Sequence, residues 1–213
     1  MPRFFVTATA AILLAASERP LPAQCEPSPP VRKILDKAAL RDEDGLSRVE
    51  QQARRTAILN EGLDLHPHDY FLLRRLILSE EDSDAKIRSA KAAREKYPHR
   101  PVYELIYAES LFGRDTPEAI RQLEALKKSH PELTRAHYVL ASVSGWGKFK
   151  DAARVKTELD GFLTACPAPL DAGVLNIATN YGAKETLAGL AAALRQRLEK
   201  ETDPLLSSVW EGL

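Results

Sequence analysis

The chain has 213 residues, of which 44% are hydrophobic and 28% are charged, so it is long enough for one substantial ordered domain. Its 30 basic and 30 acidic residues give a formal net charge of zero. Because no overall field attracts a polyanion, this balance argues against nucleic-acid binding and against adsorption to an anionic membrane surface.

The first 23 residues have the pattern of a secretory signal. Arg3 precedes an apolar stretch of about 13 residues, 4–16, which is too short to span a bilayer and has the length of a signal-peptide core. We expect cleavage after Ala23 or after Ser17, which places the mature protein outside the cytoplasm, periplasmic or secreted. A buried N-terminal helix is the alternative interpretation, and no integral membrane span is expected.

Cys25 and Cys166 are the only cysteines, and an even count in an exported protein permits a disulfide. Cys25 lies in a proline-rich arm, residues 24–30, which we expect to be extended. At roughly 10 Å per packed helix layer, several layers separate it from Cys166, whereas a bridge needs Cα atoms within about 7 Å. The spacing therefore argues against the bond unless the arm folds back. Lipid attachment at Cys25 is a less favoured interpretation, because Gln24 stands where a small residue is expected.

After the arm, residues 31–40 and 45–63 predict an opening pair of helices. Four prolines then recur at gaps of 31, 33 and 36 residues: Pro67, Pro98, Pro131 and Pro167. Each proline ends a helical apolar pattern, since proline cannot extend a helix, and two helix-length stretches lie between successive prolines. This arrangement predicts helical hairpins. Residues 169–182 and 183–201 predict a further pair, and residues 203–213 begin a last short helix.

The segment from about Leu46 to Pro167 resembles tetratricopeptide repeats. The motif GLDLHP, residues 62–67, sits on that family's end-of-repeat pattern. One full repeat is matched by Ala136, Tyr138, Leu140, Ala141, Gly147, Lys148, Phe149, Ala152 and Ala153. The first repeat departs from the family pattern, because Leu73 or Arg74 falls where a small residue is expected.

The resemblance implies an all-α fold, in which residues 31–213 form a right-handed α-α superhelix of about five antiparallel helix pairs plus a C-terminal capping helix. No strand pattern competes with it.

In such a superhelix the first helix of each pair lines the concave groove. The candidate groove residues are Arg74, Arg75, Glu109, His137, Tyr138 and Ser142. The second helices face outward, so we expect Lys86, Arg88, Lys91, Arg94 and Lys96 to form a solvated face. The acidic run 80–84 before them predicts an N-terminal cap.

No catalytic motif is present in the sequence. It contains no glycine-rich phosphate loop, no His-Glu-x-x-His, no Gly-x-Ser-x-Gly and no cysteine-histidine cluster at zinc spacing. We therefore expect a protein that is not an enzyme and that needs no metal or cofactor. A catalytic site built on Glu109 and His137 is the weakest of three hypotheses.

The leading hypothesis is an interaction scaffold that binds a segment of a protein or peptide partner in its concave groove, outside the cytoplasm. The alternative is an accessory N-terminal helical domain of an exported, thioredoxin-like redox enzyme whose catalytic part lies beyond this chain. The sequence leaves the oligomeric state open.

Overall fold

The computed structural model describes residues 25–39, 45–182 and 184–199, and within these ranges it consists of α-helices, one short 3-10 turn and no strand. The helices are α1 Pro29–Ala39, α2 Arg48–Leu65, α3 Tyr70–Leu78, α4 Ser83–Lys96, α5 Pro101–Ser110, α6 Thr116–Ser129, α7 Arg135–Ser144, α8 Ala152–Ala165, α9 Ala172–Tyr181 and α10 Lys184–Leu198. The predicted all-α fold is confirmed. The signal segment and the capping helix expected at 203–213 lie outside the described residues.

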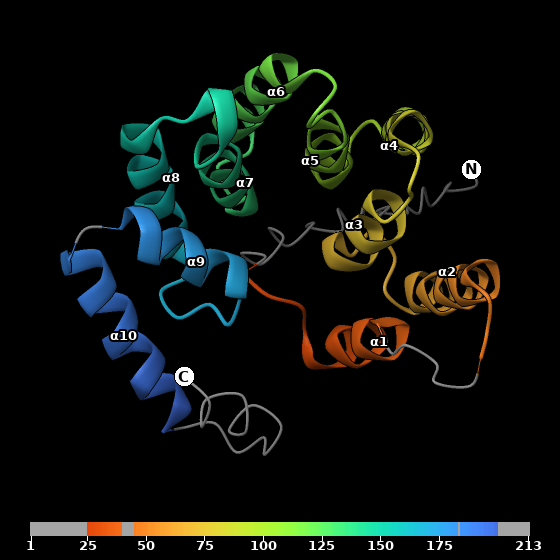
Figure 1. Ribbon diagram of the computed structural model, residues 1–213, viewed down its shortest axis with the longest axis horizontal. Coiled ribbons are helices and arrows are strands. Elements are labelled where there is room, and N and C mark those ends of the chain that lie inside the picture. Colours follow the sequence, from red (N-terminus) through yellow and green to blue (C-terminus); the bar gives the residue numbers. More distant parts are fainter. Residues whose placement is uncertain (1–24, 40–44, 183, 200–213) are drawn as a thin grey trace, which may run out of the picture.

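Consecutive helices form pairs that curve around the middle of the molecule. Each helix packs on its neighbours in sequence, and α3 also packs on α1 and α5, as α7 does on α9. Figure 1 shows the odd-numbered helices around the middle and the even-numbered helices outside them, with the N-terminal arm running from α1 toward α9. This arrangement is compatible with a helical repeat whose curve is strong enough to return on itself.

The repeat is visible in the backbone at the four prolines found in the sequence. The outer helices α2, α4, α6 and α8 each end two residues before a proline, and the residues between are His66, Tyr97, His130 and Cys166. These four adopt nearly one conformation, with φ between −127° and −136° and ψ between 60° and 72°. The residue before a proline avoids the helical region, so the chain leaves each outer helix along the same path.

Most helices begin at a side-chain cap. The residues Ser47, Asp69, Asp82, Asp115, Asp151 and Asp171 each accept a hydrogen bond from a backbone N–H of the following first turn. These bonds satisfy donors that have no partner within the helix. The predicted cap in the acidic run 80–84 is confirmed and belongs to Asp82.

The core is divided among the layers. One cluster, centred on Leu59 and Leu72, lies between the first three helices, a second around Leu105 and Leu140 joins α3 to α7, and a third around Phe162 joins α7 to α10. Truncating a fully buried leucine such as Leu105 to alanine is expected to cost about 2–5 kcal/mol. None of the described helices combines the length and the hydropathy that a membrane crossing needs.

A disulfide joins Cys25 to Cys166, with 5.5 Å between their Cα atoms. The expectation that several helix layers keep the two apart is therefore wrong. That expectation assumed that the helix layers form a straight stack. The helices instead follow a curve, which brings the end of α8 beside the N-terminal arm. The Glu26 carboxylate then bonds to Arg32 on α1, at 3.2 Å, and to Arg197 on α10, so the arm links α1 to α10.

Candidate functional site

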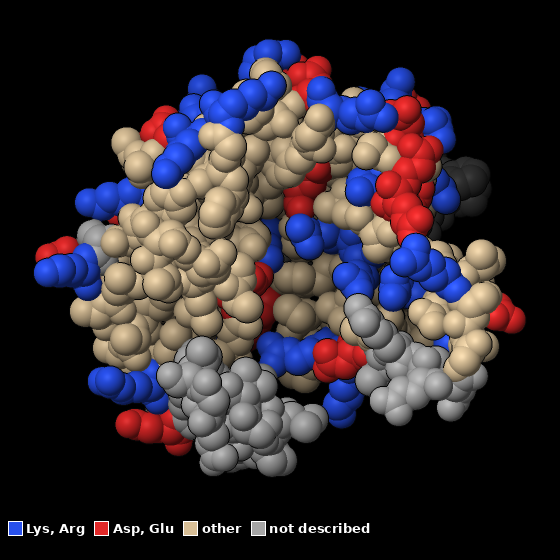
Figure 2. All heavy atoms as spheres, viewed as in Figure 1, with Lys and Arg blue, Asp and Glu red and all other residues tan. Residues whose placement is uncertain are grey.

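The odd-numbered helices surround a space that we call the inner hollow. Figure 2 shows it in the middle of the molecule, with basic and acidic side chains in its wall. One part of this wall, which we call the inner recess, is a cavity of about 220 Å³ between α3, the start of α4, α5 and α7. Its polar lining residues are Arg74, Ser83, Lys86, Glu109, Ser110, Tyr138 and Ser142.

Helix α3 presents an arginine stripe because its apolar residues face away from the hollow. Leu72 and Leu73 are buried among neighbouring helices. Arg74 and Arg75 are both exposed on α3. Arg74 lines the recess together with Leu78, one turn further along the helix. Arg75 follows Arg74 and lies close enough to Arg55 of α2 for the two positive charges to interact.

Glu109 fixes Arg74 in place. Its side chain is 3% exposed, and its Oε2 accepts a hydrogen bond from Arg74 Nε at 2.6 Å. Its Oε1 accepts from the buried Tyr70 hydroxyl. Burial and the Glu109 charge raise the pKa of Tyr70 well above its ordinary value, so Tyr70 stays a donor. Burial alone would lower the pKa of Arg74, but the negative charge and hydrogen bond of Glu109 have the larger effect, so the pKa is raised.

Arg135 organises the other side of the hollow. Its side chain is 4% exposed, and its Nη2 donates to Asp171 at 2.6 Å. Its guanidinium carbon lies 4.1 Å from the centre of the Tyr138 ring. Burial and the Asp171 charge raise the pKa of Tyr138, which keeps its hydroxyl protonated. Gly173 leaves room for that hydroxyl, because a Cβ at residue 173 would collide with it.

The N-terminal arm already lies against this wall. The Cys25 carbonyl accepts a hydrogen bond from Arg135 Nη1 at 3.4 Å, and Cys25 and Tyr138 each pack against the third core cluster. The inner face therefore holds one backbone segment that belongs to no helix.

His137 belongs to a different network. Its Nδ1 lies 2.7 Å from Glu158 Oε2, and Lys127 Nζ donates to the other oxygen of Glu158. Burial alone would raise the pKa of Glu158, but these hydrogen bonds outweigh it and the pKa is lowered. The imidazole thus sits where α6, α7 and α8 meet, so the structure does not bring His137 together with Glu109.

Four of the six predicted groove residues meet at the recess, namely Arg74, Glu109, Tyr138 and Ser142. Arg75 follows Arg74 in sequence but does not line the recess, and its pKa is lowered by burial and by the positive charges of Arg55 and Arg74. His137 is the exception, because a helix turns by 100° per residue and its side chain points toward α8 while that of Tyr138 faces the hollow.

Lys86 was missed by the sequence analysis. The prediction that it belongs to an outer solvated face is wrong for this residue, since it lines the recess. The chain between α3 and α4 is only four residues, Ser79–Asp82, so the first turn of α4 stays beside the inner helices. The shortness of that loop was the signal available in the sequence.

The recess carries an excess of positive charge. Arg74 pairs with Glu109 and Arg135 with Asp171, which leaves two formally neutral pairs. Within the described part of the chain, no carboxylate pairs with Arg75 or Lys86. Although the net charge of the chain is zero, the recess is lined by two basic side chains, Arg74 and Lys86, and one carboxylate, Glu109. Comparisons with protein families, with curated proteins and with solved structures found no match.

Proposed function

We propose that the protein is a non-enzymatic scaffold that binds an acidic, extended segment of a partner protein in its inner hollow. The observation that carries this proposal is the cationic excess at the recess, where Lys86 stands beside the Arg74–Glu109 pair. Arg75 follows Arg74 on α3, and among the described residues neither Lys86 nor Arg75 pairs with a carboxylate. Carboxylates of a partner would supply the missing counter-charges.

The shape of the site favours a chain over a small molecule. A recess of about 220 Å³ is below the roughly 300–1,000 Å³ that drug-sized ligands occupy, but it is large enough for a side chain of a segment that continues along the hollow. The arm at Cys25 supports this reading, because Arg135 there already donates to the carbonyl of a non-helical backbone. Arg74 and Tyr138 are held by neighbours in advance, so little side-chain entropy is lost on binding.

The proposal includes export and a tetratricopeptide-like origin of the fold. Export is supported by the disulfide between Cys25 and Cys166, since such bonds persist mainly in oxidising compartments. The repeat relationship is supported by the four outer helices that end in one backbone conformation before a proline.

The test is a binding measurement with a fluorescent, extended peptide rich in glutamate, serine and glycine. We expect micromolar affinity for the native chain. The double variant Arg75→Glu, Lys86→Glu should weaken binding about tenfold or more, equivalent to about 1.4 kcal/mol. Arg74→Glu is less informative, because it would place a second carboxylate against the buried Glu109.

The matched control is Lys128→Glu, Lys156→Glu, which reverses two exposed charges on the outer helices α6 and α8. It should bind the peptide as the native chain does. Equal losses in both double variants would show a diffuse charge effect and would contradict the site. An uncharged peptide of the same length that binds equally well would contradict the acidic partner.

A further inference from the structure

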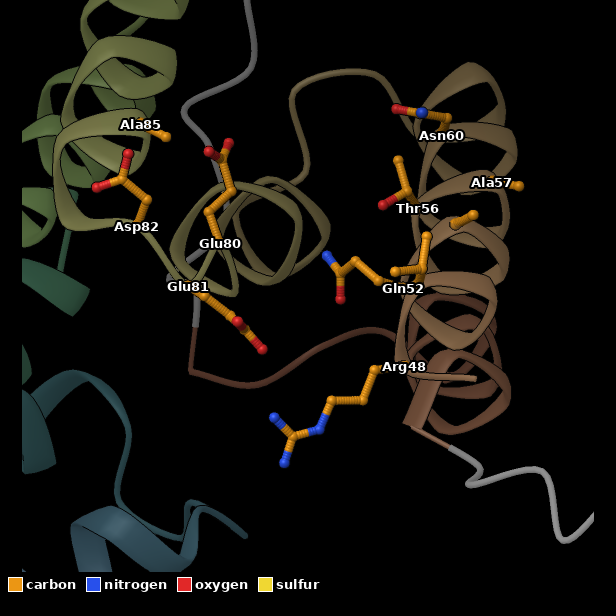
Figure 3. Close-up of a pocket in the computed structure, with 11 residues that line it drawn as sticks. Arg48, Gln52, Thr56, Ala57, Asn60, Glu80, Glu81, Asp82 and Ala85 are labelled. Carbon is orange, nitrogen blue, oxygen red and sulfur yellow. The ribbon is translucent and has the colours of Figure 1, made fainter. Parts of the chain in front are cut away.

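A second surface lies on the outside of the molecule, between α2 and α4. It is a groove of about 970 Å³ with one wall from α2 and the other from the α3–α4 turn and the start of α4 (Figure 3). At Asn60 it meets a further cavity of about 670 Å³ that continues between α2, α3 and α4 as far as Tyr97. We call the two together the outer groove.

The groove exists because the inner helix of this pair is short. Helix α3 has 9 residues, whereas its flanking outer helices α2 and α4 have 18 and 14. At 1.5 Å per residue, α2 extends about 27 Å and α3 only about 14 Å. The two outer helices therefore overhang the helix on which both pack.

The lining suits the approach of another helix. The wall from α2 offers Ala53 and Ala57, and the wall from α4 offers Ala85. Further along, the floor includes Leu73 and Leu76. Small side chains let helix axes approach to about 8–10 Å, and a groove that follows α2 for most of its length accommodates about four helical turns.

Charge distinguishes the two ends of the groove. Where α2 and α4 begin, Glu80, Glu81 and Asp82 line it against a single cation, Arg48. Figure 3 shows Arg48 and Glu81 reaching into the gap from opposite walls. Glu80 accepts a hydrogen bond from a serine, and within the described ranges no cation pairs with Glu81. This end is net negative.

The direction of the walls sets the direction of a guest helix. Both α2 and α4 begin at the acidic end, so they run parallel. A helix lying antiparallel to them would place its C-terminal turn there, and that turn favours lysine and arginine. We propose that the outer groove docks an amphipathic helix of another protein, with an alanine- and leucine-rich face in the groove and basic residues in its last turn against Glu80 and Glu81.

The chain's own C-terminal segment is a poorer match. Residues 203–213 contain apolar side chains, but their charged residues are Asp203 and Glu211 and they include no lysine or arginine. Like charges would meet at the acidic end of the groove. A guest with a basic last turn is therefore a segment other than residues 203–213.

The probe is a synthetic 16-residue amphipathic helix with alanine and leucine on one face and lysines in its last turn. Its matched counterpart carries glutamates in that turn. Anisotropy should show micromolar binding of the lysine peptide to the native chain and at least tenfold weaker binding of the glutamate peptide. Ala57 is exposed in the groove wall, and the substitution Ala57→Arg should weaken binding of the lysine peptide at least tenfold. Ala125 is likewise exposed but lies on α6, so the control substitution Ala125→Arg should leave binding of the lysine peptide unchanged.

Exchanging the charges in the groove provides a sharper test. The variant Glu80→Lys, Glu81→Lys should reverse the preference and bind the glutamate peptide more tightly. The proposal would be overturned if this variant still bound the lysine peptide more tightly, or if the lysine peptide bound the Ala57→Arg variant as tightly as the native chain.

Two other occupants of the groove are tested separately. If sedimentation showed a dimer that the Ala57→Arg substitution abolishes, the groove would bind a second copy of the chain. If a peptide of residues 200–213 displaced the lysine peptide, the groove would bind the chain's own C-terminal segment. Either result also overturns the proposal. The Arg75→Glu, Lys86→Glu variant should bind the lysine peptide normally, which separates the two surfaces.

Discussion

At the scale of single residues, two buried carboxylates link neighbouring helices. Glu109 joins α3 to α5 through Arg74, and Glu158 joins α8 to α6 and α7 through Lys127 and His137. A buried carboxylate is costly unless donors surround it. Each of these two has a donor at both oxygens, so each specifies one arrangement of the helices it links.

Replacing Glu158 by glutamine should lower the free energy of unfolding at pH 7 by about 1–3 kcal/mol, because a charged hydrogen-bond acceptor is lost. The folded-state pKa of Glu158 lies below its ordinary value of 4.5, so the unfolded state takes up the proton first as the pH falls. The stabilisation is complete above about pH 4.5 and is lost as the pH drops through the folded-state pKa. Urea unfolding of both chains at pH 7 and pH 3 measures this.

The control for that experiment is Glu124→Gln. Glu124 contacts the same Lys127 at 3.4 Å, but its side chain is 31% exposed, so we expect a loss below about 0.5 kcal/mol. A gap between native and Glu158→Gln chains that is as large at pH 3 as at pH 7 would show that packing, and not charge, is responsible.

At the scale of helices, starts and stops are set by local chemistry. The Asp69 carboxylate accepts hydrogen bonds from two backbone N–H groups of α3, those of Phe71 and Leu72. This cap orients the helix that carries Arg74 and Arg75. At the other end of each repeat, proline prevents the outer helix from continuing.

Removing the cap with Asp69→Ala should cost about 1 kcal/mol of stability. Asp69→Asn should keep most of it, since asparagine caps helices about as well as aspartate. Thermal unfolding followed by circular dichroism distinguishes the three chains. Equal losses in both variants would mean that the negative charge, and not the hydrogen bonds, stabilises the start of α3.

These local signals explain what the sequence predicts well. The prolines and the capping aspartates act within a few residues, so the helices and the four repeat ends follow from the sequence. The direction of a side chain is harder to predict from the sequence, because an error of one residue in helical phase changes the expected direction by 100°. That is why Tyr138 lines the recess, whereas its neighbour His137 contacts Glu158 on α8. The position of Lys86 at the recess depends on the length of the loop between α3 and α4.

The disulfide lay beyond such reasoning for another reason. The distance between Cys25 and Cys166 depends on the summed rotation of every helix pair between them. Small angles accumulate into a curve that closes, and no local residue pattern reports their sum. The cationic hollow is a product of the same curve, because it gathers side chains from α3, α4 and α5 around one space.

At the scale of the whole molecule, the disulfide holds the two ends of the curve together. Cys25→Ser, Cys166→Ser should lower the free energy of unfolding by about 2–4 kcal/mol, since the bond spans 141 residues and restricts the unfolded chain. We also expect a larger radius of gyration by X-ray scattering, because among the described residues the polar contacts left to hold the arm would be those of Glu26 and the Arg135–Cys25 carbonyl bond. Unchanged stability and size would show that helix packing alone closes the curve.

The most direct test of the central claim is a ¹⁵N–¹H NMR titration of the native chain with the acidic extended peptide. If the inner hollow binds it, saturable shifts will appear at the amides of α3, α5 and α7, near Arg75, Ser110 and Ser142, while the exposed faces of α6 and α8 stay unchanged. Shifts confined to the outer helices, or none at peptide concentrations in the millimolar range, would contradict the account.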